Sequence, residues 1–205
     1  MTLRTRKERY RSELRAETLT AARELIQKEG YAGLTIRKLA QRLECSPMAL
    51  YSYFADKQAL LTALALEGFE KVAKRFDSTA HRDPLTAVRR ILLDYIAYAE
   101  ENPNEYRILF LSVETLGVVQ QSREEMQERN PAFGALFKRV EACIKAGVLQ
   151  GDAFAVSTVV WTAAHGAAST LITAQKFPFS SRRLYAEEVI ETILSGAQNR
   201  TIAGG

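Results

Sequence analysis

The strongest constraint on the fold lies in residues 35–57, TIRKLAQRLECSPMALYSYFADK, whose pattern predicts two short helices joined by a tight turn. In the first helix, Ile36, Leu39, Ala40 and Leu43 follow the i, i+3, i+4, i+7 spacing of one buried face. Thr35 precedes this helix and can accept a hydrogen bond from one of its first backbone N–H groups. One face of the pair is therefore committed to packing, and the other faces remain available.

The second helix of the pair is predicted to begin at Pro47, after a turn at residues 44–45. Ser46 can cap this helix, and proline suits its first position because the fixed φ angle is already helical. Leu50 and Phe54 are expected to point inward. The residues left for the other faces are Met48, Ala49, Tyr51, Ser52 and Tyr53. This arrangement is typical of a helix-turn-helix, in which one face holds the pair rigid and another enters the major groove of DNA.

A plain helical hairpin is the alternative interpretation, because short turns between helices are common in helical bundles. The charge distribution favours DNA binding over this alternative. Residues 1–57 contain 12 Lys and Arg against 7 Asp and Glu, whereas the rest of the chain contains 16 against 17. The whole positive excess therefore lies with the helix pair, as expected of a domain that faces phosphate groups.

The segment GYAGLTIRKLAQRLECSPMALYSYFADKQALL resembles the N-terminal domain of the TetR/AcrR family of bacterial transcriptional regulators. The resemblance covers residues 11–71 and depends on many positions that agree at fixed spacing. These positions are Gly30-Tyr31, Thr35, Ala40, Leu50-Tyr51, Phe54 and Asp56-Lys57. The resemblance implies a DNA-binding domain over residues 11–71, with its helix-turn-helix at residues 35–54.

The resemblance also implies roles for individual residues. The positions that usually contact phosphates in the family are Thr35, Ser46, Tyr51, Tyr53 and Lys57. The positions that read base edges are Arg37, Met48, Ala49 and Ser52. Met48 and Ala49 suit contact with a thymine methyl group, whereas Arg37 suits either a guanine contact or an exposed, solvated surface.

An amphipathic helix is predicted ahead of the pair, because Leu19, Ala22 and Ile26 repeat at helical spacing and Gly30 marks an end. The start of this segment is basic, with Glu8 opposing Arg4, Arg6, Lys7, Arg9 and Arg11. Two interpretations remain open for these cations. They can form the solvated start of a helix, or an arm that adds contacts to DNA phosphates or to the minor groove.

The remaining residues, 72–205, are predicted to be helical throughout, so the fold class is all-α. A capping residue followed by proline marks helix starts at Asp83-Pro84, Asn102-Pro103 and Asn130-Pro131, as at Ser46-Pro47. An apolar stripe near the C-terminus is formed by Ala186, Val189, Ile190, Ile193, Leu194 and Ala197. The polar stretch at residues 120–130 is predicted to be exposed. The expected architecture is an N-terminal three-helix helix-turn-helix domain followed by a helical ligand-binding and dimerisation domain.

Residues 153–175 contain no Asp, Glu, Lys or Arg, and a segment of this length must be considered as a membrane span. We reject a span because the segment consists mostly of Ala, Ser and Thr and has too little Leu, Ile or Phe. A helix that is apolar all round is buried all round, so a second copy of the chain can cover its outer face. With the C-terminal stripe, this predicts a homodimer built on a four-helix bundle, which is also the usual dimer of the TetR family.

Trp161, His165 and Gly166 form W-x-x-x-H-G, which resembles a motif in one group of C-terminal domains of the family. In the family, the interior of this domain is a pocket for a small-molecule effector, so the resemblance implies an apolar ligand. The candidate ligand-binding residues are Tyr95, Tyr98, Tyr106, Phe110, Phe133, Phe137, Trp161 and His165. The alternative is that each of these is an ordinary core residue.

No catalytic site, metal site or cofactor is predicted. His81 and His165 are the only histidines, and no nucleophile and base accompany them in a recognisable pattern. Cys45 and Cys143 lack the spacing of metal ligands and indicate a reducing, cytoplasmic setting. The first residues are charged rather than apolar, so no signal peptide is predicted.

The sequence therefore predicts a homodimeric, sequence-specific DNA-binding transcriptional regulator. We expect a repressor that an apolar small molecule releases from a near-palindromic operator in double-stranded DNA. Two alternatives remain open: a sequence-tolerant architectural DNA-binding protein, and a helical small-molecule carrier or enzyme whose DNA motif is unused.

Overall fold

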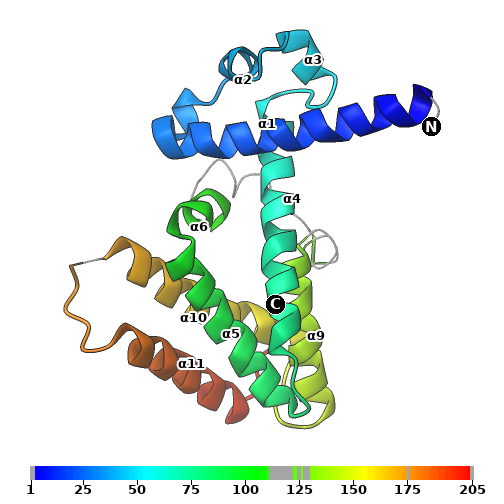
Figure 1. Ribbon diagram of the computed structural model, residues 1–205. Coiled ribbons are helices and arrows are strands. Elements are labelled where there is room, and N and C mark those ends of the chain that lie inside the picture. Colours follow the sequence, from blue (N-terminus) through cyan, green and yellow to red (C-terminus); the bar gives the residue numbers. More distant parts are fainter. Residues whose placement is uncertain (1–2, 111–121, 124–125, 127–129, 175, 204–205) are drawn as a thin grey trace. The chain divides into compact units, whose positions relative to one another are not determined.

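The computed structural model describes residues 3–110, 122–123, 126, 130–174 and 176–203 (Figure 1). The chain divides into two compact units. The N-terminal unit contains residues 1–67 and 107–119, and the C-terminal unit contains residues 68–106 and 120–205. Apart from one isolated β-bridge, the regular structure in the described part of the chain is helical, which confirms the predicted all-α class.

In the described residues, the N-terminal unit contains three whole helices and parts of two others. They are α1 (Leu3–Gly33), α2 (Ile36–Arg42), α3 (Pro47–Tyr51), the first half of α4 (Lys57–Phe76) and the last turn of α6 (Pro103–Phe110). The core that these elements share includes Leu19, Ala22, Leu25, Leu34, Leu39, Leu50, Phe54, Leu60, Leu64 and Ile108. Gly30 has a φ angle of 71°, which interrupts α1 at the position where the sequence predicted its end.

Tyr31 joins three elements of this unit. Its hydroxyl donates a hydrogen bond to the carbonyl of Ile108 at 2.9 Å, and its own carbonyl accepts one from Lys57 Nζ at 2.6 Å. These bonds tie the junction of α1 and α2 to the start of α4 and to the end of α6. The end of α6 was not expected in the DNA-binding domain, because its residues lie far from that domain in the sequence.

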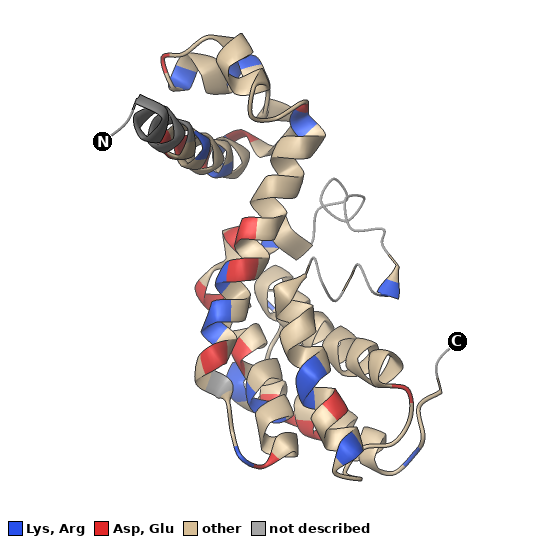
Figure 2. Ribbon diagram, turned by 90° about the vertical axis from the view of Figure 1, so that its right-hand side faces the viewer, with Lys and Arg blue, Asp and Glu red and all other residues tan. Residues whose placement is uncertain are grey.

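The C-terminal unit packs around α5 (Pro84–Glu101), which contacts α9 (Pro131–Lys145), α10 (Ala153–Thr173) and α11 (Arg182–Gln198). A short 3-10 helix, η1 (Asp77–Thr79), connects α4 to this group. α10 also packs against α9 and α11, and it carries no charged residue, as its uniform tan colour in Figure 2 shows. By length and composition α10 could span a membrane, yet 44% of its most apolar window is buried inside the protein.

Most of the predicted helix caps are present. Asp83 accepts a hydrogen bond from Thr86 N at 2.8 Å, and Asn130 accepts one from Phe133 N at 3.0 Å. Asn102 differs, because its amide nitrogen donates to the carbonyl of Tyr98 at 3.2 Å and so closes the end of α5. In the predicted exposed stretch at 120–130, Ser122 and Arg123 are exposed and Met126 and Asn130 are not; the other positions lie outside the described residues.

The C-terminal segment pairs with the turn between α9 and α10. Asp152 N donates to the carbonyl of Ile202 at 2.9 Å, and Ile202 N donates to the carbonyl of Gln150 at 3.2 Å. Gly151 lies between these bonds with a φ angle of 120°. A Cβ atom at this position would lie 2.0 Å from the Ile202 carbonyl oxygen, so only glycine fits here.

Substitution of Gly151 with alanine is predicted to lower the free energy of unfolding by about 1–3 kcal/mol, because the new methyl group breaks this pairing. Urea unfolding followed by circular dichroism measures the change. Gly147→Ala is the matched control, since Gly147 also has a positive φ of 70° but open space around its Cβ position. Equal losses in the two variants would show that backbone strain alone, and not the contact with Ile202, makes Gly151 necessary.

Candidate nucleic-acid interface and effector site

The turn of the helix pair is fixed by capping and by backbone hydrogen bonds. The Thr35 hydroxyl accepts from Lys38 N at 3.2 Å and begins α2, as predicted. At the other end of α2, Cys45 N donates to the carbonyl of Ala40 at 3.0 Å. Glu44 adopts a φ angle of 50°, a left-handed conformation that is uncommon for a residue with a Cβ atom. The turn therefore reverses the chain within three residues.

The second helix of the pair, α3, presents an exposed face above a buried anchor. The Ser46 hydroxyl accepts from Ala49 N at 3.2 Å and begins the helix, as predicted. Leu50 is completely buried, whereas Met48 is 77% exposed and Tyr51 is 49% exposed. Because Leu50 packs on one side of α3, the large side chains of Met48 and Tyr51 are exposed to solvent on the other side.

Phe54 is buried as expected, but it lies beyond the helix rather than within it. α3 ends at Tyr51, and the backbone N–H groups of Tyr53 and Phe54 both donate to the carbonyl of Leu50 at 3.0 Å. The helix therefore ends three residues before Phe54, although the spacing of four residues between Leu50 and Phe54 is typical of one helical face. The burial prediction is confirmed, and the predicted helical length is wrong.

The other predicted DNA contacts occupy varied positions. Ser52 is exposed and its hydroxyl donates to the carbonyl of Ala49 at 2.7 Å. Tyr53 is half-buried and packs against the core of the N-terminal unit. The ammonium group of Lys57 donates a hydrogen bond to the carbonyl of Tyr31, and this bond fixes where the charge of Lys57 lies. These three residues stay candidates for DNA contact.

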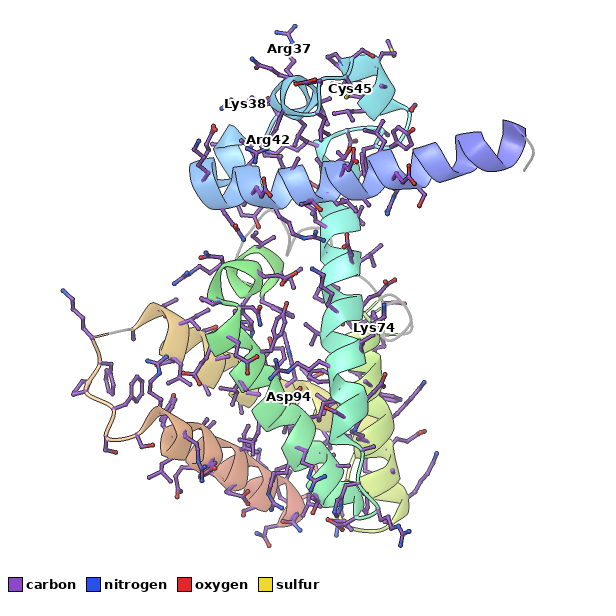
Figure 3. All side chains as sticks on the ribbon, viewed as in Figure 1. Arg37, Lys38, Arg42, Cys45, Lys74 and Asp94 are labelled. Atoms are coloured by element: carbon purple, nitrogen blue, oxygen red, sulfur yellow. The ribbon has the colours of Figure 1, made fainter. Side chains whose placement is uncertain are left out.

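Three cations on α2 differ in their partners. Lys38 Nζ lies 2.5 Å from a carboxylate oxygen of Glu29, and Arg42 is paired with Glu24. The hydrogen bond from Lys38 lowers the pKa of Glu29. Arg37 is exposed and forms no ion pair within the described part of the chain, and its side chain points away from α1 (Figure 3). Among the three cations of α2, Arg37 is therefore the one whose charge is exposed and is not paired with a carboxylate in the described residues.

A polar cluster lies inside the C-terminal unit, where α5, α6 and α10 meet. The hydroxyls of Tyr95 and Tyr106 are 3.0 Å apart, and they lie 3.0 and 2.7 Å from Nδ1 of His165. A neutral histidine nitrogen either accepts or donates one hydrogen bond, and each hydroxyl supplies one proton. At most two of the three contacts can therefore be ordinary hydrogen bonds at one time.

Aromatic rings surround this cluster. The ring centre of His165 is 5.2 Å from that of Trp161 and 5.7 Å from that of Tyr106. Phe133 follows at 6.5 Å from Trp161, and Phe154 lies 5.5 Å from Phe133. Phe154 was not among the predicted residues, although it stands seven residues before Trp161 and so falls on the same face of α10.

Burial keeps the cluster neutral. Loss of solvation raises the pKa of Tyr95 well above its ordinary value and raises that of Tyr106 to about 12. The same cause lowers the pKa of His165. The hydroxyls therefore stay protonated and can donate, while the imidazole stays uncharged near pH 7.

Three further predicted ligand residues lie on α5, α9 and α6. Tyr98 is buried on α5, and Phe137 is half-buried on α9. Phe110 is buried and belongs to the N-terminal unit. No group of three or more His, Cys, Asp or Glu side chains in the described ranges is placed to hold a metal ion.

Comparison with known families gives two matches. Residues 19–64 match the family described as bacterial regulatory proteins, tetR family, and residues 88–193 match the tetracyclin repressor-like C-terminal domain. The second match alone covers more than half of the chain. The chain belongs to the TetR family. This confirms the resemblance seen in residues 11–71 and extends it through most of the C-terminal unit.

Two curated relatives of this TetR-family protein are named as transcriptional regulators. The HTH-type transcriptional regulator UidR of Escherichia coli is 29% identical over 140 residues, which cover 66% of this chain and 63% of UidR. The HTH-type transcriptional regulator YobS of Bacillus subtilis is 30% identical over 94 residues, which cover 45% of this chain and 49% of YobS. The chain thus spans about half to just under two thirds of the length of these relatives.

Solved structures share the fold. A protein from Rhodococcus sp. RHA1 superposes with a TM-score of 0.70 at 20% identity, covering 90% of this chain and 95% of the other. A TetR family transcription regulator from Marinobacter aquaeolei VT8 has the same TM-score at 17% identity, covering 97% of this chain and all of its own. The predicted order of a helix-turn-helix domain followed by a helical C-terminal domain is confirmed.

Removal of the Arg37 charge is predicted to weaken DNA binding more than removal of the Arg42 charge. Arg37→Gln should cost about 1–3 kcal/mol of binding free energy, because its guanidinium is exposed and uncommitted. Arg42→Gln, the matched control, should cost less than about 1 kcal/mol, because Glu24 already pairs that charge. Fluorescence anisotropy with a labelled operator measures both. Equal losses would assign the effect to overall charge rather than to a contact made by Arg37.

Acid is predicted to destabilise the C-terminal unit through His165. Its pKa is lowered in the folded chain, so the unfolded chain takes up the proton first as pH falls below about 6.5. Stability contributed by the neutral imidazole is therefore present above this pH and is lost as pH falls towards the folded pKa. His165→Gln should show a smaller drop in Tm between neutral and mildly acidic buffer than the parent protein, as measured by calorimetry. His81→Gln, at an exposed histidine, is the matched control for the loss of one imidazole group.

Proposed function

We propose that this protein is a homodimeric, sequence-specific DNA-binding regulator that represses transcription and is released from its operator by a small molecule. The proposal rests on α3, where Met48 and Tyr51 are exposed above the buried Leu50. A helix held rigidly by one face and presenting large side chains on the other is suited to the major groove. We expect the protein to act in the cytoplasm, where its DNA would be.

Repression is supported by the names of two relatives. An HTH-type transcriptional repressor of Mycobacterium tuberculosis, Rv1474c, is 37% identical over 79 residues, covering 38% of this chain and 40% of its own. The tetracycline repressor protein class D of Escherichia coli is 47% identical over 53 residues, covering 26% of this chain and 24% of its own. These matches favour a repressor over an activator or an enzyme.

The dimer would form through α10 and α11. The inward face of α11 buries Ala186, Ile190 and Leu194, which fill the core of the unit. Beside this face, a shallow and largely apolar groove is lined by Ala163, Tyr185, Glu188, Val189, Thr192 and Ile193. Two such faces related by a two-fold axis would complete a four-helix bundle.

The effector would bind at the cluster of Tyr95, Tyr106 and His165. Its ring-lined surroundings favour an apolar ligand body, and its hydroxyl donors favour one hydrogen-bonding atom on that body. A ligand that binds better to a form unable to fit the operator weakens DNA binding, and DNA weakens ligand binding equally. Coupling of this kind is typically about 1–3 kcal/mol, or roughly 5- to 150-fold in affinity.

Selection of bound duplexes from a random-sequence DNA pool tests the proposal. We expect enrichment of a two-fold-symmetric site, with half-sites spaced by about one duplex turn or a small multiple. The control is Met48→Ala/Tyr51→Ala, which changes only exposed side chains and should abolish the enrichment. Binding without enrichment would favour an architectural DNA-binding protein. Absence of DNA binding by a folded protein would favour a carrier or enzyme.

A further inference from the structure

Aromatic rings gather where residues 176–181 lead from α10 into α11 (Figure 1). The ring centres of Phe177 and Phe179 are 4.7 Å apart, and those of Phe179 and Tyr185 are 4.8 Å apart. The planes of the two pairs are inclined at 47° and 45°. Phe177 is 59% exposed, although phenylalanine is among the residues most often buried. The three rings therefore form a curved and partly exposed aromatic surface.

Hydrogen bonds hold the backbone that carries these rings. Phe177 N donates to the carbonyl of Ala174 at 2.9 Å, and Phe179 N donates to the carbonyl of Phe177 at 2.8 Å. At the start of α11, Arg182 Nη2 donates to the carbonyl of Leu171 on α10 at 2.6 Å. Both ends of the connection are thus tied to α10, so the rings have a defined place.

A surface hollow of about 490 Å³ lies against the rings. Its lining includes Phe177, Phe179, Leu184, Tyr185 and Glu188. Leu184 is 54% exposed, and Glu188 follows Tyr185 by three residues, so these two share a face of α11. A volume of roughly 300–1,000 Å³ with mostly apolar walls and few polar groups is typical of small-molecule sites. The hollow has the size and the composition of such a site.

Glu188 supplies a negative charge to the hollow, and no ion pair with it forms within the part of the chain that the structure describes. The two arginines of the first turn of α11 are paired elsewhere. Arg182 Nε lies 2.7 Å from a carboxylate oxygen of Glu100, and Arg183 Nε lies 3.0 Å from one of Glu187. The carboxylate of Glu188 therefore stands beside the aromatic rings without a compensating cation from these neighbours.

A second copy of the chain would not supply that cation through the neighbouring groove. Tyr185 and Glu188 line both the hollow and the groove assigned above to the dimer, and no lining residue of the groove is Lys or Arg. A two-fold axis presents the same surface on both subunits, so it would bring a second carboxylate towards the first. Charge complementarity at the hollow favours a separate cation over a second copy.

We propose that this hollow is a second small-molecule site, which binds an organic cation with an apolar or aromatic body. Aromatic rings attract cations through the negative charge of their faces, and Glu188 adds a full opposite charge at the same place. Tyr95, Tyr106 and His165 do not line the hollow, so it is distinct from the candidate effector site. The site would exist whether or not the protein binds DNA.

Calorimetric titration with tetraphenylphosphonium tests the site, with tetraphenylborate as an anion of the same shape. The cation should bind more tightly than the anion. Glu188→Gln removes the charge and should weaken cation binding by up to about fivefold at physiological salt. Phe177→Leu keeps an apolar side chain but removes a ring face, and it should weaken binding by about two- to fivefold. Glu187→Gln, the matched control, removes a carboxylate that pairs with Arg183 and should keep the parent affinity.

Three results would overturn the proposal. Equal affinity for the two ions would assign binding to apolar contact alone. An unchanged affinity in Glu188→Gln, or an equal loss in Glu187→Gln, would place the cation elsewhere or attribute its binding to total charge. If sedimentation equilibrium shows that Phe177→Leu and Glu188→Gln weaken self-association without changing cation affinity, the hollow belongs to an interface between copies. None of these measurements involves DNA, so their failure is separate from a failure of the proposed regulator function.

Discussion

The burial of Leu50 is the constraint on which the candidate DNA interface depends. α3 contains five residues, which are too few to be helical in isolation, so its structure comes from packing and from the cap at Ser46. Because Leu50 is completely buried against the core of the N-terminal unit, Met48 and Tyr51 must face outward. The direction of the reading face is thus set by one inward side chain.

Local sequence patterns were sufficient for most of the fold. Helix starts at Ser46, Asp83 and Asn130 follow from side-chain oxygens placed just before proline, a signal contained within a few residues. Asn102 has the same pattern but binds backward to the end of α5, because its amide can also donate a hydrogen bond. The pairing of Gly151 with the C-terminal segment could not be predicted, since its partners are separated by about 50 residues and share no periodic pattern.

The residues of the candidate sites could be predicted only where the helical spacing of apolar residues shows which side chains are exposed. The outward position of Met48 follows from the helix pattern, but the difference between Arg37 and Arg42 does not, because it depends on the position of Glu24 on another helix. In the C-terminal unit, the pattern of aromatic residues indicated candidates without showing which of them meet. The convergence of Tyr95, Tyr106 and His165 requires three helices and is visible only in three dimensions.

Trp161 is the only tryptophan in the chain, and its ring centre lies 5.2 Å from that of His165. The emission of an indole group responds to the polarity and to the quenching groups of its immediate surroundings. All tryptophan fluorescence of this protein therefore originates beside the polar cluster, with no second source to obscure it. The unlabelled chain carries an optical reporter at the candidate effector site, which can be read while the protein is free or bound to DNA.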